Sequence, residues 1–292
     1  VIDTLIWPLT MRDYNLNERV RRACHALAVD DERNAFHPRL WNEQPDPRRA
    51  GVGVPGGNLA TERIDQERIS QVWFAGVHSN VGGGYPDDSL AHVSLTWMLS
   101  EARSRGLTLK AAPGADPDAF TRVRSTQDKD GRIYDSRNGL SGHYRYGPRS
   151  VAALSDTKFT ADKRDRVNIA IPKIHESVFD RISVDAHLYA PVALPPAYEI
   201  LTYDERIVSP DDLTVRPNQP KYESSGAALH RERTQEHEVG SSIWRRRIIY
   251  FLTVIASIYL LTYPLTSTAP AAAEFTTPLR PLSDVIRMIG WV

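Results

Sequence analysis

The stretch best suited to chemistry is HSNVGGGY, residues 78–85. It follows a largely apolar run at residues 69–77, typical of a buried inner strand, and precedes a segment with helical character at residues 89–103. A histidine on a loop at the carboxyl end of a strand can accept a proton from a nucleophilic hydroxyl. Glycines beside it let the backbone approach a neighbouring loop closely. The pattern therefore predicts a catalytic histidine, His78, with a supporting loop of Asn80, Gly82, Gly83 and Gly84.

Plainer interpretations of the same residues remain open. The glycines could simply form a turn, with His78 an ordinary surface residue. A phosphate-cradling P-loop is disfavoured because no lysine follows the glycines. His175 and Glu176 could form an acid–base pair, but adjacent residues on a helix point apart, so a structural or rim role is favoured. His25 and His37 have no partners at metal-ligand spacing, so the sequence predicts no metal and no cofactor.

The surrounding elements are read from periodicity and from turn residues. Apolar spacing predicts a helix over residues 18–29, capped by Asn17. A Pro- and Gly-rich surface loop is expected over residues 44–63, and a lid or insertion over residues 111–165. The helix at residues 89–103 should turn its apolar side chains toward a core and be capped by an acid or a serine just before it. The side chains expected to face the core are Leu90, Val93, Trp97 and Met98, and the expected cap is Asp87, Asp88 or Ser89.

Charge and cysteine content limit the partners. Lys plus Arg and Asp plus Glu both number 36, so no excess of basic residues indicates a nucleic-acid partner. The single cysteine, Cys24, cannot form an internal disulfide, which favours a reducing compartment and a buried structural thiol.

An uncharged apolar run near the C-terminus indicates a membrane helix. Residues 248–265 span roughly 27 Å as a helix, close to the thickness of the hydrocarbon core of a bilayer. Arg245, Arg246 and Arg247 precede the run, and the positive-inside rule then places the preceding part of the chain in the cytoplasm. The sequence thus predicts a single-pass membrane protein with membrane lipid as a partner.

Longer motifs carry a resemblance to a known family. The segments RACHALAVDDERNAFHPRLW and QVWFAGVHSNVGGGYPDDSLAHVSLTWML, with IHESV and YAPVALPPAYE further on, resemble an uncharacterised α/β-hydrolase family that includes type VI secretion phospholipase effectors. The similarity covers about residues 5–200. It implies that His78 completes a Ser-Asp-His triad. The family often has Asp where this chain has Asn80, so any charge at that position is lost.

Two parts of the family's triad are not found in the sequence. The family's serine lies in a G-x-S-x-G elbow, and no such motif occurs in the 292 residues. Its acid lies in a Trp-Asp-Thr stretch, which Asp3-Thr4 matches only in part. The segment IWPL at residues 6–9 follows at once and resembles the region beyond that acid, which disfavours Asp3.

These observations define the predicted architecture. The fold class is α/β, an incomplete α/β-hydrolase-like sheet flanked by helices, plus a C-terminal transmembrane helix. Residues 1–205 form the C-terminal part of the hydrolase-like domain, residues 206–243 a polar linker, residues 244–266 the transmembrane helix and residues 267–292 a short tail.

The function that follows is a truncated, membrane-tethered serine hydrolase of lipase or phospholipase type. It would act on a lipid or another acyl ester and be inactive alone, because the nucleophile is missing. The alternative is a non-catalytic, membrane-anchored interaction protein on a decayed hydrolase scaffold. The reading frame upstream of Val1 would distinguish them, since a glycine-flanked serine there supports the enzyme.

Overall fold

The structure is a computed structural model that describes residues 14–17, 19–33, 36–43, 62–109, 118–136, 147, 149–158, 166–184, 186–210 and 225–266. The chain divides into two compact units, Val1–His237 and Glu238–Val292. Some predictions fall outside the described residues. They concern the acid candidate Asp3, most of the loop at 44–63, much of the lid or insertion at 111–165, and the tail at 267–292.

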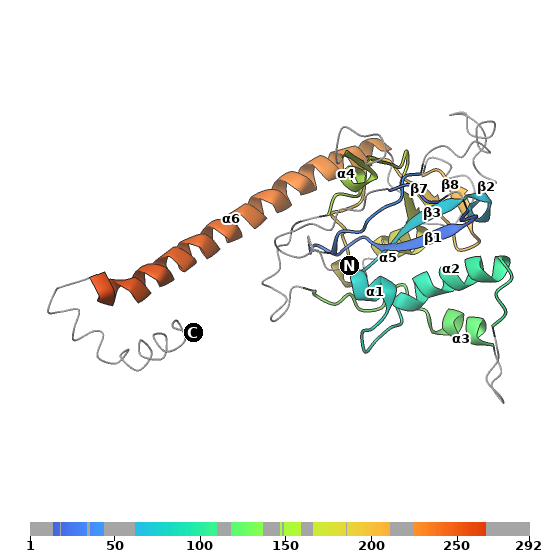
Figure 1. The fold of residues 1–292 in the computed structure, drawn as a ribbon, viewed down its shortest axis with the longest axis horizontal. Helices are drawn as coiled ribbons and strands as arrows, with labels where there is room; N and C mark the ends of the chain where they lie inside the picture. Colours follow the sequence, from blue (N-terminus) through green and yellow to red (C-terminus); the bar gives the residue numbers. More distant parts are fainter. Residues whose placement is uncertain are drawn as a thin grey trace. The chain divides into compact units, whose positions relative to one another are not determined.

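A mixed six-stranded sheet organises the first unit (Figure 1). Its strand order is β1-β3-β6-β7-β8-β2. The pairs β1–β3, β3–β6 and β6–β7 are parallel, whereas β7–β8 and β8–β2 are antiparallel. The bounds are β1 (Ala23–Ala28), β2 (Glu62–Arg63), β3 (Ile69–Phe74), β6 (Lys173–His175), β7 (Glu199–Leu201) and β8 (Arg206–Val208).

Side chains that alternate along β3 fill the cores on both faces of the sheet. Val72 and Phe74 belong to one apolar cluster, and Trp73 belongs to the other; all three are buried. This double burial explains why the strand is apolar almost throughout instead of alternating with polar residues. The prediction of an inner strand at residues 69–77 is confirmed, with the regular strand ending at Phe74.

Two helices cover the two faces of the sheet. Helix α2 (Ala91–Ser104) contributes Val93 and Trp97 to the Val72–Phe74 cluster, and the Trp97 ring lies 5.6 Å from that of Phe74. Helix α5 (Glu176–Ser183) packs Val178 and Phe179 into the opposite cluster with Trp73.

The helix predicted at residues 89–103 is confirmed, but its details differ. Met98 is 36% exposed instead of facing the core. Leu90 occupies the position before the helix, and no side chain caps it. The Asp88 carboxylate instead accepts hydrogen bonds from the N–H groups of Gly84 and Tyr85 and so stabilises the preceding turn.

The helix predicted at residues 18–29 is wrong. Ala23 to Ala28 form strand β1, which pairs in parallel with β3 over its whole length. The apolar spacing fits a helix, but β1 gains a full ladder of backbone hydrogen bonds and buries Leu27 beside Trp73. Tertiary pairing therefore overrides the local pattern, and places the residues after Ala28 beside those after Phe74.

Shorter elements complete the first unit. Residues 171–182 contain β6 and most of α5, and residues 189–200 lead into β7. The remaining elements are the 3-10 turns η3 (Ile64–Gln66) and η6 (Ala186–Leu188), the helices α1 (His78–Gly82), α3 (Ala119–Thr126) and α4 (Val151–Ser155), and the two-stranded sheet of β4 (Asp156–Lys158) and β5 (Arg166–Asn168).

The predicted transmembrane helix is wrong, and with it that part of the predicted fold class. The apolar run lies in α6 (Ser225–Thr266), a 42-residue helix whose first half is polar. Within the described residues, no helix is both long enough and apolar enough to cross a membrane.

Candidate functional site

His78 lies at the carboxyl edge of the sheet, four residues beyond Phe74, which belongs to the last pair of the β1–β3 ladder. It is the first residue of α1, not a loop residue as predicted. Its side chain is exposed, and the edge of the Phe36 ring contacts it at a centroid distance of 5.3 Å. Partial desolvation lowers the pKa of His78 below its ordinary value, and the nearby charge of Asp31 opposes this shift. The imidazole is therefore mainly neutral near pH 7 and able to accept a proton.

Asp31 fixes the backbone of His78. Its Oδ2 accepts the His78 N–H at 3.0 Å, and its carboxylate also pairs with Arg33 at 2.7 Å. Burial would raise the pKa of Asp31, but hydrogen bonds from Arg33 and His78 outweigh burial and hold the pKa below its ordinary value. A buried, ionised carboxylate thus sits at the N-terminus of α1, close to the candidate base.

Asp30 fixes the turn that leads to His78. Its Oδ2 accepts the Gly76 N–H at 2.6 Å and the Tyr189 hydroxyl at 2.8 Å, and its own N–H donates to the Gly76 carbonyl at 3.1 Å. Burial raises the pKa of Asp30 to about 6 despite these bonds. The neighbouring acids therefore hold both ends of residues 76–78, Asp30 by its bonds to Gly76 and Asp31 by its bond to His78.

Gly76 and Asn80 fit together inside this turn. Gly76 has φ +106°, and a Cβ added to it would lie 2.4 Å from the Cβ of Asn80. Asn80 is buried; its Oδ1 accepts the N–H groups of Val77 and Tyr134, both at 3.3 Å, and its Nδ2 donates to the Arg132 carbonyl at 3.0 Å. The amide thus supplies donor and acceptor bonds at once, which a carboxylate could not do.

The predicted glycine loop has two parts. Gly82 ends α1, whereas Gly83 and Gly84 leave it with φ values of +83° and +112°. Among the described residues, no heavy atom beyond the neighbouring backbone lies within 4 Å of a Cβ built on any of the three. These glycines permit the backbone path out of α1 and do not admit a close neighbouring loop.

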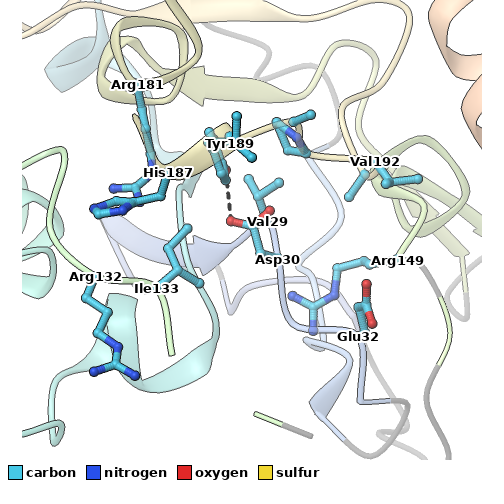
Figure 2. Close-up of a pocket in the computed structure, with 14 residues that line it drawn as sticks. Val29, Asp30, Glu32, Arg132, Ile133, Arg149, Arg181, His187, Tyr189 and Val192 are labelled. Atoms are coloured by element: carbon cyan, nitrogen blue, oxygen red, sulfur yellow. Dashed lines mark hydrogen bonds between the residues drawn. The ribbon is translucent and has the colours of Figure 1, made fainter. Parts of the chain in front are cut away.

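A cavity of about 510 Å³ opens beside this turn, lined partly by Asp30 (Figure 2). Its walls come from the segments after β1 and after α3, the segment before α4, helix α5 and the segment after α5. The lining includes the charged or titratable residues Asp30, Glu32, Arg132, Arg149, Arg181 and His187. His78 is not among the lining residues, so the cavity and the candidate base are separate features joined by Asp30 and Asp31.

His175 and Glu176 have structural roles. The His175 ring is buried, stacks on Phe74 at 4.7 Å, and its Nδ1 bonds the Ser177 hydroxyl at 2.8 Å. Burial lowers the pKa of His175 to about 3, so the ring stays neutral. Glu176 accepts the Tyr203 N–H at 3.0 Å. Ser177 is only 2% exposed, which excludes this serine–histidine pair as a nucleophile open to substrate in the described conformation.

No metal centre is apparent in the part of the chain that the structure describes. There, no three residues among His, Cys, Asp and Glu are grouped closely enough to hold an ion. His25 packs on the Trp41 ring at 5.5 Å, and burial lowers its pKa. Burial also lowers the pKa of His37.

Four functional candidates were missed in the sequence. Asp30 and Asp31 directly follow the stretch that was wrongly predicted as a helix, residues 18–29, although acids directly after an apolar run could have indicated the end of a strand. Arg149 and Arg181 gave no local signal, because only the fold brings these two buried residues to one cavity.

Comparison with known proteins supports the resemblance seen in the motifs. Residues 3–101 match the family model described as T6SS, phospholipase effector Tle1-like, catalytic domain. An uncharacterized protein of Saccharomyces cerevisiae, YEL023C, is 32% identical over 77 residues, which is 25% of this chain. The aligned region is only 11% of the yeast protein. No solved structure matches the chain.

Proposed function

From the match of residues 3–101 to a phospholipase effector catalytic domain, we propose that this chain carries the histidine-bearing part of a lipase-like ester hydrolase. The observation that carries the proposal is the position of His78. It follows an inner parallel strand inside the matched region, and its backbone is held by a buried carboxylate. Histidines of Ser-His-Asp hydrolases lie after a late parallel strand and act as the general base.

In the proposed reaction, His78 takes the proton from a serine hydroxyl as that oxygen attacks the ester carbonyl. It then returns the proton to the leaving alcohol, and a water molecule releases the acyl group by the same two transfers. The serine is supplied by a segment that these 292 residues do not contain, since they hold no G-x-S-x-G elbow.

Asp31 is proposed as a positioning residue. Its hydrogen bond is with the His78 backbone N–H, not with the ring, so Asp31 affects the position and charge of the imidazole. A negative charge here stabilises the imidazolium that forms when the serine loses its proton.

The proposed substrate class is a phospholipid or another acyl lipid, on the strength of the family match. The test compares this chain with a version extended upstream to include a glycine-flanked serine, both assayed on phospholipid vesicles for released fatty acid. We expect release only from the extended version. Fatty acid released by the 292-residue chain, or none released by either, would contradict the proposal.

A second candidate is a non-catalytic binding protein on the same scaffold. The absence of a serine elbow from the sequence favours it, and so does a cavity lined by buried arginines whose chemistry suits binding. An extended version that binds lipid without hydrolysing it would support this alternative.

A further inference from the structure

Two buried arginines line the cavity beside the candidate site. Arg149 precedes α4 and Arg181 lies in the last turn of α5, and they are 3% and 1% exposed. Guanidinium groups stay charged in proteins, so burying one requires compensation from carboxylates, carbonyl dipoles or a ligand. Two such groups at one cavity therefore call for an explanation.

Their bonds within the chain compensate only part of this charge. Arg149 donates to the carbonyl oxygens of Ala28 and Phe36, and Arg181 donates through one nitrogen to those of Lys129 and Gly131. Among the described residues, neither forms an ion pair, and the buried Nε of each has no hydrogen-bond partner. Desolvation lowers the pKa of Arg149 to about 10, which reports the same shortage.

Asp30 is the carboxylate that faces both guanidinium groups. In the view of Figure 2 it lies between Arg149 and Arg181. It acts on them through space, while its Oδ2 is already used by Gly76 and Tyr189. The buried Asp31 also acts on Arg149 from outside the cavity lining. The lining itself carries three arginines, Arg132, Arg149 and Arg181, against two carboxylates, Asp30 and Glu32, so its net charge is positive.

The rest of the cavity suits an organic group attached to an anion. Its other walls are largely apolar, from Val29, Ile133 and residues 190–193, and its volume lies within the range of small-molecule sites. Arg132 and His187 add exposed donors to the lining. His187 and Leu188 both have φ 57°, the left-handed conformation that side chains rarely adopt, and such residues cluster at ligand sites.

We propose that this cavity binds a phosphate ester, with the phosphate held by Arg149 and Arg181 and the organic part against the apolar wall. A forked guanidinium matches phosphate oxygens in charge and geometry. The cavity goes beyond the proposed hydrolase function, because binding there needs neither His78 nor a serine. Two sources share this chemistry: a soluble phosphate ester and the headgroup of a phospholipid.

The test is direct binding to the 292-residue chain, measured by isothermal titration calorimetry. Glycerol 3-phosphate represents the soluble source, and monomeric dihexanoyl phosphatidylglycerol the lipid source; acetate is the control anion. We expect saturable binding of at least one phosphate probe and none of acetate. Binding of glycerol 3-phosphate assigns the soluble source, and binding of the lipid probe alone assigns the headgroup. If neither probe binds, the proposal for this cavity is overturned, and the proposed hydrolase role of His78 is unaffected.

Variants of the charged residues provide the control for folding. Arg149→Gln and Arg181→Gln should each weaken binding about tenfold or more, the usual effect of losing a hydrogen bond to a charged group. Arg122→Gln, on the exposed surface of α3, should leave affinity unchanged. Asp30→Asn should tighten binding, because it removes the opposing charge. This gain of affinity cannot arise from unfolding, so weaker binding in folded Asp30→Asn would contradict the proposal even if the arginine variants misfold.

Discussion

Replacing Gly76 by alanine should destabilise the fold more than its conformation alone would explain. Gly76 has φ +106°, and an added Cβ would lie 2.4 Å from the Cβ of Asn80, a separation that real Cβ atoms essentially never show. The side chain of Asn80 is held by three hydrogen bonds, so it has little freedom to move away. The substitution therefore tests whether the turn before His78 is packed as described.

The expected loss is the sum of three effects. A left-handed backbone costs a residue with a side chain about 2 kcal/mol, and overpacking adds about 2 kcal/mol. Lower entropy of the unfolded chain returns about 1 kcal/mol, so Gly76→Ala should lower the free energy of unfolding by about 3 kcal/mol. Gly106 has φ +93° with no atom within 4 Å of an added Cβ. Gly106→Ala should therefore cost only about 1 kcal/mol.

Urea unfolding followed by tryptophan fluorescence measures both variants, since Trp73 and Trp97 are buried in the two cores. Asn80→Gly removes the Cβ that Gly76→Ala would strike. In that background, the cost of Gly76→Ala should fall to the level of Gly106→Ala. Equal losses for Gly76→Ala and Gly106→Ala, or an unchanged cost in the Asn80→Gly background, would refute the packing argument.

Three further predictions follow from titratable groups. Because the pKa of Asp30 is raised, the folded state keeps a proton that the unfolded state releases between about pH 4 and 6, and this group removes up to about 3 kcal/mol of stability as the pH rises through that window. Asp30→Asn should abolish this loss in urea unfolding measured across the window. A stability difference between variant and wild type that is the same at pH 4 and pH 6 would contradict the prediction. Asp31→Asn should lower the pKa of His78 further, because a negative charge that favours the imidazolium is lost; a rise in this pKa in NMR titration would count against their proximity. Burial raises the pKa of Cys24 to about 12, so iodoacetamide at pH 8 should react with it much more slowly in the folded protein than in urea; equal rates would show an accessible thiol.

Strong local patterns predicted the core of the fold. The apolar run of β3 and the periodicity of α2 indicated their types, because both elements are buried and their sequences reflect that burial directly. The position of His78 at the end of β3 followed from the same pattern. The short helix α1 did not, since glycine-rich residues 82–84 indicate a turn and the helix holds only five residues.

Pairing between distant segments could not be predicted. β1 has helical spacing, and only its ladder with β3 makes it a strand. This error hid Asp30 and Asp31, which reach the site because two parallel strands end together. Arg149 reaches the cavity from more than a hundred residues beyond β1. The apolar run in α6 was overinterpreted as a membrane span, since no helix of the described residues is both long enough and apolar enough to cross a membrane.

The most direct test of the central claim is the activity of the His78→Ala variant of the extended, serine-containing protein on a short acyl ester. His237→Ala, an exposed histidine of α6, serves as the matched control. If His78 is the general base, its loss should lower turnover on the order of 10⁴-fold, while the control keeps normal activity and both variants remain folded. Near-normal turnover in the folded His78→Ala variant would contradict the account.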